Sequence, residues 1–153
     1  MKRTTKRTAV LLTVAMMALQ TAAFAATAPE SVALPSPAAA ETVSIQPRGA
    51  FFWQGTSTIS PNSGSVTVSG QTKCYESVGE IGVTLTVYRS LGGGAWEYVW
   101  SNTYKGYNTR TLQTPNINVP TGSGTYKVEG YHYAIKNGVT ESNWSETNSV
   151  TVW

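Results

Sequence analysis

The chain has 153 residues, of which 11 are Lys or Arg, 8 are Asp or Glu, one is His and one is Cys. Four basic residues lie within the first seven positions, so the remainder carries 11 − 4 = 7 basic against 8 acidic residues, a balance that excludes nucleic acid and anionic membrane as partners selected by charge. All acidic residues are Glu, and the single His132 and Cys74 argue against a Ser-His-Asp triad and against a metal site.

Residues 1–25 have the three parts of a secretory signal. A basic head from Lys2 to Arg7 precedes an apolar run from Thr8 to Ala23, and Ala23-Phe24-Ala25 gives the small-x-small pattern that signal peptidase cleaves. A membrane anchor is the alternative, but the run is interrupted by polar residues and is short for a bilayer. We therefore predict a secreted, extracellular protein, cleaved after Ala25, with no membrane insertion after cleavage.

Residues 26–50 contain four of the seven prolines and show neither strand nor helix periodicity. Such a segment buries too little apolar surface to offset its chain entropy, so we predict a disordered or extended spacer. A cleaved pro-segment is the alternative. The folded domain is then expected at 51–153, long enough for one modest core.

The rest of the sequence alternates between strand and turn patterns. Polar and apolar residues alternate in the four segments 65–68, 83–88, 125–134 and 150–152, and Gly-rich or Asn-rich turns separate them. Asn137-Gly138 is the strongest turn signal, because both residues tolerate the positive φ of a type I′ hairpin. The pattern predicts an all-β fold, an antiparallel β-sandwich of six to seven strands.

The segment Gly124-Thr125-Tyr126-Lys127-Val128 sharpens this prediction. A Tyr two residues before a core position, after a Gly-rich turn, is typical of the tyrosine corner of immunoglobulin-like domains, where the hydroxyl bonds to nearby backbone. Val128 occupies the position of the second cysteine of such domains, and no disulfide is expected. Lys127 should face water.

Several short motifs extend over nearly the whole domain: Arg48-Gly49, Gly94-Ala95-Trp96, the run from Gly124 to His132, and Glu141-Ser142. With these motifs the chain resembles a family of small uncharacterised secreted proteins of Gram-positive bacteria, built as a signal peptide plus one immunoglobulin-like β domain. The resemblance implies a fold and a compartment. It implies no activity and no site residues.

Residues suited to catalysis are few. His132 is expected on the inward side of its strand, as a neutral, hydrogen-bonded core histidine. Cys74 is expected to be a small buried hydrophobe in a monomer, with an exposed thiol that bridges two chains as the alternative. Glu129 and Glu141 could approach across the last hairpin and serve a hydrolase, although surface glutamates that support solubility are the simpler interpretation.

Aromatic residues exceed what a small core needs, with 5 Trp and 8 Tyr in the chain. If the valines of each strand point inward, then Tyr88, Tyr131, Tyr133 and Trp153 point outward from one sheet. Such a face could bind a sugar or a protein, or its rings could only stabilise the sheet through cross-strand pairing. A second stripe, Trp96, Tyr98 and Trp100, has no direction that the sequence fixes.

These features favour a secreted non-enzymatic binding module without a cofactor, which recognises cell-wall glycan or a surface protein through the outward aromatic residues. The first alternative is a secreted effector or bacteriocin-like protein that acts on other cells. The remote alternative is a glutamate-dependent hydrolase.

Overall fold

Strands joined by turns and short loops make up the part of the chain that the computed structural model describes, residues 40–45 and 49–153. All of it belongs to one compact unit. The predicted signal peptide and most of the predicted spacer lie outside the described residues. In the described part, no helix is long and apolar enough to cross a membrane.

Eight antiparallel strands form one sheet, with the path β1-β2-β3-β6-β7, while β4 and β5 pair with β3 and β8 pairs with β6. The strands are β1 (Glu41–Ile45), β2 (Phe52–Asn62), β3 (Ser65–Gly92), β4 (Ala95–Gln113), β5 (Ile117–Pro120), β6 (Gly124–Lys136), β7 (Val139–Glu146) and β8 (Val150–Val152). The predicted all-β, antiparallel class is confirmed.

Strand β1 corrects two predictions. It raises the number of strands from six or seven to eight, and it lies before residue 50, where the spacer was expected to end. This strand falls inside the predicted spacer and pairs with β2, from Glu41 opposite Ile59 to Ile45 opposite Gly55. A five-residue strand between proline-rich stretches is too short to stand out in the sequence, and pairing with the edge of β2 stabilises it.

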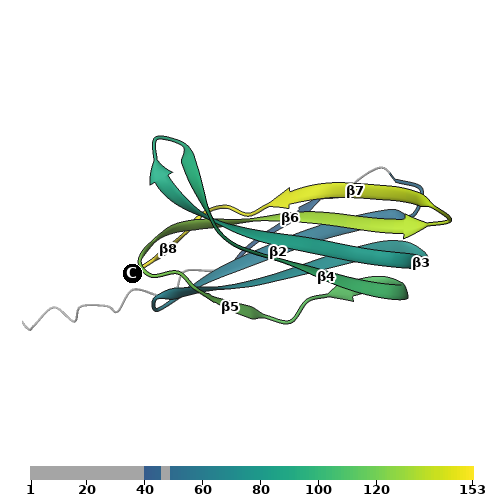
Figure 1. Ribbon diagram of the computed structural model, residues 1–153, viewed down its shortest axis with the longest axis horizontal. Coiled ribbons are helices and arrows are strands. Elements are labelled where there is room, and N and C mark those ends of the chain that lie inside the picture. Colours follow the sequence, from purple (N-terminus) through teal and green to yellow (C-terminus); the bar gives the residue numbers. More distant parts are fainter. Residues whose placement is uncertain (1–39, 46–48) are drawn as a thin grey trace, which may run out of the picture. The chain divides into compact units, whose positions relative to one another are not determined.

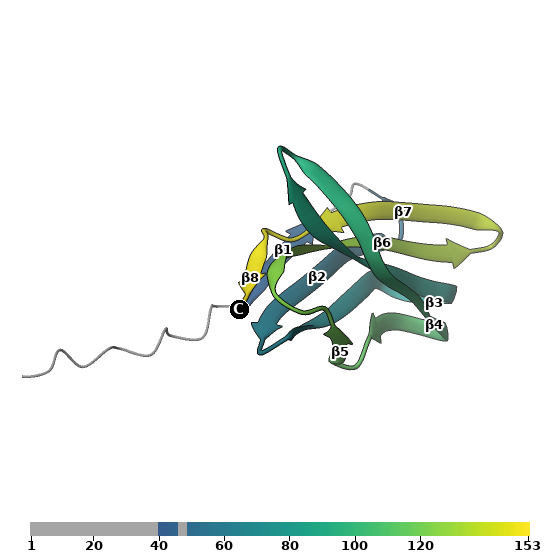
Figure 2. The same ribbon diagram turned by 60° about the vertical axis from the view of Figure 1, so that its left-hand side comes forward.

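The long strand β3 belongs to two layers (Figures 1 and 2). Its first part pairs with β2 and β5, and its second part, from Glu80 to Arg89, pairs with β6. Between them the register with β4 breaks from Lys73 to Val78. Because β2 packs against β6, β7 and β8 without pairing with them, the sheet folds over on itself, an arrangement consistent with a β-sandwich.

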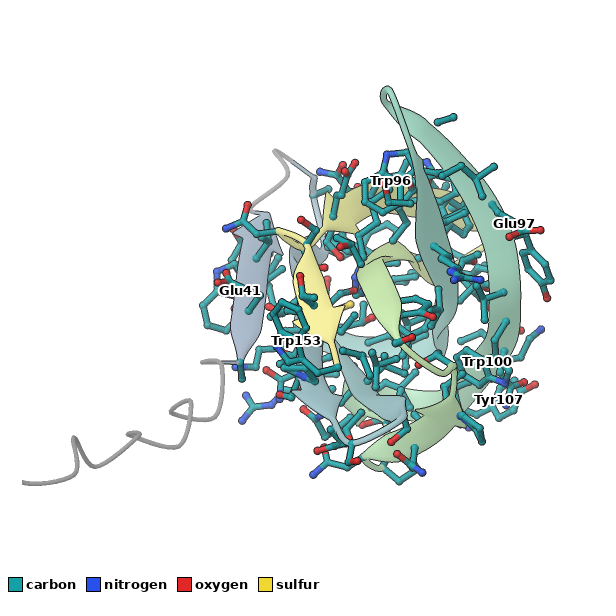
Figure 3. All side chains as sticks on the ribbon, turned by 90° about the vertical axis from the view of Figure 1, so that its left-hand side faces the viewer. Glu41, Trp96, Glu97, Trp100, Tyr107 and Trp153 are labelled. Carbon is teal, nitrogen blue, oxygen red and sulfur yellow. The ribbon has the colours of Figure 1, made fainter. Side chains whose placement is uncertain are left out.

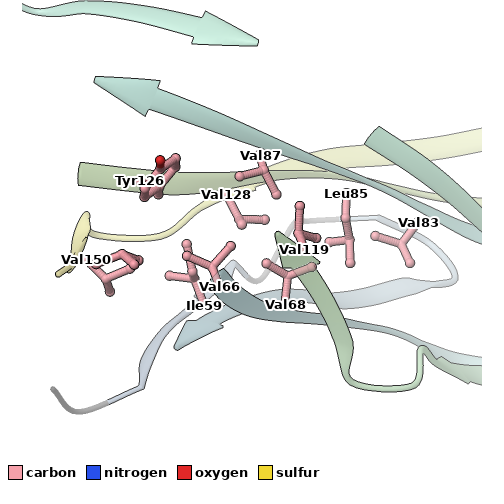
Figure 4. Close-up of a cluster of buried hydrophobic side chains, with 11 residues drawn as sticks. Ile59, Val66, Val68, Val83, Leu85, Val87, Val119, Tyr126, Val128 and Val150 are labelled. Atoms are coloured by element: carbon pink, nitrogen blue, oxygen red, sulfur yellow. The ribbon is translucent and has the colours of Figure 1, made fainter. Parts of the chain in front are cut away.

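Apolar side chains between the layers form two clusters. The larger one, shown in Figure 4, gathers Ile59, Val66, Val68, Val83, Leu85, Val87, Val119, Tyr126, Val128, Val150 and Val152. The smaller one gathers Phe51, Phe52, Cys74, Val78, Ile81 and Ala134. The inward alternation that the sequence indicates for Val83 to Val87 and for Val150 and Val152 is confirmed.

Two predicted local structures are also present. Asn137 and Gly138 have φ values of 51° and 77°, as a type I′ turn requires, and they join β6 to β7. The Tyr126 hydroxyl donates a hydrogen bond of 2.8 Å to the carbonyl oxygen of Thr121, five residues upstream. This is the backbone bond predicted for a tyrosine corner.

Candidate functional site

The outward side of β6 and its neighbours carries most of the residues proposed for binding. Tyr131 and Tyr133 lie two positions apart on β6 with ring centroids 6.0 Å apart. Tyr88, on β3, is paired in register with Lys127 of β6 and lies on the same side of the sheet. Tyr88, Tyr131 and Tyr133 therefore lie on one side of the sheet, as the alternation of their strands predicts.

Trp153 is the exception among the four predicted residues. It follows β8, whose last residue, Val152, is opposite Gly124 at the start of β6. Its side chain is 88% exposed and lies beside β8 in Figure 3, and it has no ring contact with Tyr88, Tyr131 or Tyr133 among the described residues. The structure does not bring Trp153 to the other three.

Tyr133 points outward but is only 9% exposed, so its prediction as an exposed binding residue is corrected. Its ring lies across Gly82, where a Cβ atom would meet the ring at 2.2 Å. Its hydroxyl donates a 2.7 Å hydrogen bond to Glu80 Oε1, and Lys105 Nζ lies 2.8 Å from the same oxygen. These two hydrogen bonds lower the pKa of Glu80, and the one from Lys105 has the larger effect.

Trp144 on β7 was missed in the sequence. It is directly opposite Tyr131, the ring centroids are 4.9 Å apart, and its side chain is 56% exposed. The Asn137-Gly138 hairpin could have revealed it, because a two-residue turn that pairs Lys136 with Val139 sets Tyr131 against Trp144. The segment 139–146 has no apolar alternation that would mark a strand by itself.

Lys127 was predicted to face water, and this prediction is wrong, because the residue is only 8% exposed. Its Nζ lies 2.8 Å from Glu146 Oε1 and 2.9 Å from Glu129 Oε1, and 4.8 Å from the centroid of the Trp96 ring. Burial acts to lower the pKa of Lys127, but the hydrogen bonds that Lys127 donates to the two glutamates outweigh it and the pKa is raised.

The hairpin between β3 and β4 explains this burial. It rises away from the sheet above β6 (Figures 1 and 2), and Figure 3 shows Trp96 directed toward the body of the domain and Glu97 directed away. Strand β4 contains a bulge at Val99. Val87 of β3 is opposite Trp100, and the next residue, Tyr88, is opposite Tyr98. Val99 therefore has no partner on β3, and it breaks the alternation of β4. The bulge splits the predicted stripe, because Trp100 packs against the core while Trp96 covers Lys127.

These residues form a continuous surface that we call the aromatic face. It consists of Tyr88, Trp96, Tyr131 and Trp144 with Lys127, Glu129 and Glu146 between them. Two carboxylates share one ammonium group, so acceptor oxygens stand beside exposed rings. The arrangement can stack a planar apolar surface and accept hydrogen bonds next to it.

His132 is a buried structural residue, as its inward parity predicts. Its Nδ1 lies 2.9 Å from Thr72 Oγ1, its Nε2 lies 2.8 Å from Ser145 Oγ, and the hydroxyls of Ser145 and Ser57 are 2.7 Å apart. Desolvation lowers the pKa of His132 to about 4. Among the described residues no glutamate is hydrogen-bonded to the buried ring, so the Ser-His contact lacks the acidic member of a hydrolytic triad.

The carboxylate pair proposed for hydrolysis does not form. Glu129 is opposite Glu146, whereas Glu141 is opposite Ala134, 134 − 129 = 5 residues further along β6. Glu141 instead accepts hydrogen bonds from the backbone N–H groups of Ala50, Phe51 and Phe52 at 2.7, 3.1 and 2.7 Å. Its role is to hold the chain that enters β2.

Cys74 is buried and unpaired, as predicted from its parity with Val66 and Val68. Desolvation, with a smaller effect of the Glu141 charge, raises the pKa of its thiol to about 11. Across residues 40–45 and 49–153, no three His, Cys or Glu side chains gather in an arrangement that could hold a metal ion.

No protein-family model matches the chain, and neither a curated protein nor a solved structure is significantly similar to it.

Proposed function

We propose that the protein is a secreted, non-enzymatic module that binds a glycan of a cell wall through the aromatic face. The observation that carries the proposal is Trp144, more than half exposed and tilted at 47° against Tyr131, with Glu146 two residues along the same strand. Rigid aromatic rings beside carboxylate oxygens are suited to a sugar.

A pyranose has an apolar side of C–H groups and a rim of hydroxyls. The rings of Trp144 and Tyr131 offer a stacking surface that loses little side-chain entropy on binding. Glu129 and Glu146 retain acceptor capacity for sugar hydroxyls, because Lys127 engages only one oxygen of each.

The local charge also favours a neutral ligand. Two glutamates surround one lysine on the aromatic face, so no net positive charge is present to select an anion. The burial of His132 and the separation of Glu129 from Glu141 support a role in binding rather than catalysis.

The wider context of the proposal is an immunoglobulin-like domain of a secreted Gram-positive protein. The Tyr126 hydrogen bond supports the immunoglobulin-like type, and the Ala23-Phe24-Ala25 pattern supports export. In that setting a cell-wall glycan is the polymer that the protein meets at highest local concentration.

The test is retention of the secreted protein on peptidoglycan sacculi and on chitin, with the sacculi treated with protease to remove wall proteins. We expect the matrix to retain the parent protein and to lose the Tyr131→Ala and Trp144→Ala variants. The melting temperatures of both variants should show an intact fold. Tyr107→Ala is the matched control, because Tyr107, on β4, is as exposed as Trp144 but lies outside the aromatic face.

Trp153→Ala tests whether the fourth predicted residue contributes. Because Trp153 makes no ring contact with Tyr88, Tyr131 or Tyr133 among the described residues, we expect unchanged retention. The proposal is wrong if the parent does not bind, if Tyr131→Ala and Trp144→Ala bind like the parent, or if retention disappears after protease treatment. The last outcome would identify a surface protein as the partner.

A further inference from the structure

A second surface on the domain combines rings with unpaired positive charge. A pocket of about 470 Å³ is lined by Trp53, Lys73, Cys74, Tyr75, Arg110 and Thr111. Its volume falls within the range of about 300–1,000 Å³ that is usual for small-molecule sites. None of these residues belongs to the aromatic face.

Two irregularities of the sheet build this pocket. Phe52 is opposite Cys74 and the next paired residue of β2 is opposite Lys73, so Trp53 is a bulged residue, and it points outward while Phe52 is buried. On the other side, Lys73 is opposite Thr111 and Val78 is opposite Thr109, so residues 74–77 bend past Arg110. Bulges commonly redirect side chains in this way beside functional sites.

The pocket walls are held in place by backbone hydrogen bonds, by the Thr109 hydroxyl and by the stacking of two lining rings. The backbone N–H of Tyr75 donates to the carbonyl oxygen of Phe51 at 2.9 Å. The Thr109 hydroxyl bonds to the carbonyl oxygen and the N–H of Thr111, at 3.2 and 3.3 Å, and so fixes the backbone on both sides of Arg110. The rings of Trp53 and Tyr75 are stacked, with centroids 6.1 Å apart and planes at 24°.

The two cations of the pocket, Lys73 and Arg110, differ from the other lysines of the described domain. Lys105, Lys127 and Lys136 each form an ion pair with a glutamate. Lys73 and Arg110 form none with any carboxylate of the described residues, and Lys73 Nζ lies 5.6 Å from the Trp53 ring centroid. Glu141 is close enough to affect Cys74, but its oxygens accept three backbone N–H bonds.

We propose that this pocket binds a saccharide that carries a carboxylate, with the sugar ring stacked on Trp53 and Tyr75 and the carboxylate held by Arg110 and Lys73. The planar guanidinium of Arg110 matches a carboxylate in bidentate geometry, and Lys73 adds a second charge. Thr111 adds a hydroxyl for the sugar rim.

The proposal goes beyond the neutral-glycan site and does not depend on it. Single-stranded nucleic acid also stacks on aromatic rings, but it needs a basic groove that follows several phosphates. Here two cations share one pocket, and the described domain carries six basic residues against seven glutamates. A single anionic sugar unit therefore suits the pocket better than a polyanion.

The test is a titration of the secreted protein with oligogalacturonate, followed by calorimetry and by tryptophan fluorescence. Fully methyl-esterified oligogalacturonate is the matched ligand without charge. Arg110→Gln and Trp53→Ala remove the proposed contacts, and Arg89→Gln is the matched control because Arg89 is an exposed cation of β3 far along the strand from residues 73–75. Tyr131→Ala reports on the aromatic face in the same assay.

We expect saturable binding of oligogalacturonate and no binding of the esterified ligand. Arg110→Gln and Trp53→Ala should each weaken the binding at least tenfold. Arg89→Gln and Tyr131→Ala should leave it unchanged. The proposal is overturned by the absence of saturable binding, by equal losses in Arg110→Gln and Arg89→Gln, or by tighter binding of a single-stranded oligonucleotide to the same residues. Loss of binding in Tyr131→Ala alone would assign the acidic sugar to the aromatic face instead.

Discussion

His132 is the centre of a buried polar group that includes Ser57, Thr72 and Ser145. Along β6 the inward residues run from Val128 in the larger cluster through Gly130 and His132 to Ala134 in the smaller one. The imidazole has room because its neighbours are glycines, and a Cβ atom on Gly55 would meet the ring at 2.5 Å. A small hydrogen-bonded polar group, with His132 at its centre, therefore lies between the two apolar clusters.

This burial predicts a pH dependence of stability. The pKa of His132 is about 4 in the fold and close to 6.5 in the unfolded chain, so the unfolded state binds the extra proton. Stability should change little between about pH 6.5 and pH 8 and should fall by about 2 kcal/mol between pH 6.5 and pH 5. Urea unfolding at these pH values measures the change.

His132→Gln should flatten this dependence, because it removes the titrating group. Glu80 and Glu141 have lowered pKa values in the fold, so their contributions are lost only as the pH falls below about 4.5 and do not interfere above pH 5. An equal slope in the parent and in His132→Gln would contradict this account.

Tyr126 and Lys127 give a second pair of predictions at the residue scale. Tyr126→Phe removes a buried hydroxyl that bonds to the Thr121 carbonyl, and should lower the free energy of unfolding by about 0.5–1.5 kcal/mol. Lys127→Ala should also cost about 1 kcal/mol or more, because it removes the shared cation of Glu129 and Glu146 and uncovers Trp96. Chemical denaturation of both variants measures these losses. If Lys127→Ala had the same free energy of unfolding as the parent, the hairpin would not cover Lys127 in solution.

Cys74 should be chemically inert in the folded protein. Its thiol is buried and its pKa is about 11, so the reactive thiolate is scarce at pH 8. Labelling with a thiol reagent should be slow in buffer and fast in denaturant, and a non-reducing gel should show no dimer. A stoichiometric disulfide dimer would make Cys74 an assembly residue.

At the scale of elements, the short strand β8 closes the larger cluster. Val150 and Val152 are buried and pair with the start of β6, next to the tyrosine corner. Deletion of residues 149–153 should cost about 1.5–3 kcal/mol for each of the two valines, which approaches the whole stability of a small domain.

Deletion of Trp153 alone is the control for this truncation, because its exposed side chain should contribute little. Thermal unfolding followed by circular dichroism distinguishes the two. Cooperative unfolding that survives the longer deletion at an unchanged temperature would show that β8 is not part of the core.

At the scale of the whole molecule, β1 extends the sheet to Glu41, ten residues before Phe51. It covers one edge of β2, and Asn148 Nδ2 donates a 3.1 Å hydrogen bond to Glu41 Oε2. A protein that starts at Phe51 should be less stable than one that starts at Ala40, and more prone to associate through the uncovered edge. Comparison of the two by melting temperature and by light scattering tests the boundary, and identical behaviour would restore residue 50 as the limit.

The sequence by itself determined the strand class, the Asn137-Gly138 turn, the corner bond of Tyr126, and the outward direction of Tyr88, Tyr131 and Tyr133. These features depend on contacts between residues close in the chain, or on the two-residue period of a strand, which the order of amino acids expresses directly.

Tertiary structure alone decided the rest. The bulges at Trp53 and Val99 shift the period by one residue, so alternation cannot assign Trp96, Tyr98 and Trp100 to one side. The burial of Lys127 depends on a hairpin about thirty residues earlier in the chain, and the pocket at Arg110 depends on where β3 bends between its two layers. Contacts of this kind are made by the sheet when it folds over, and no local pattern in the sequence encodes them.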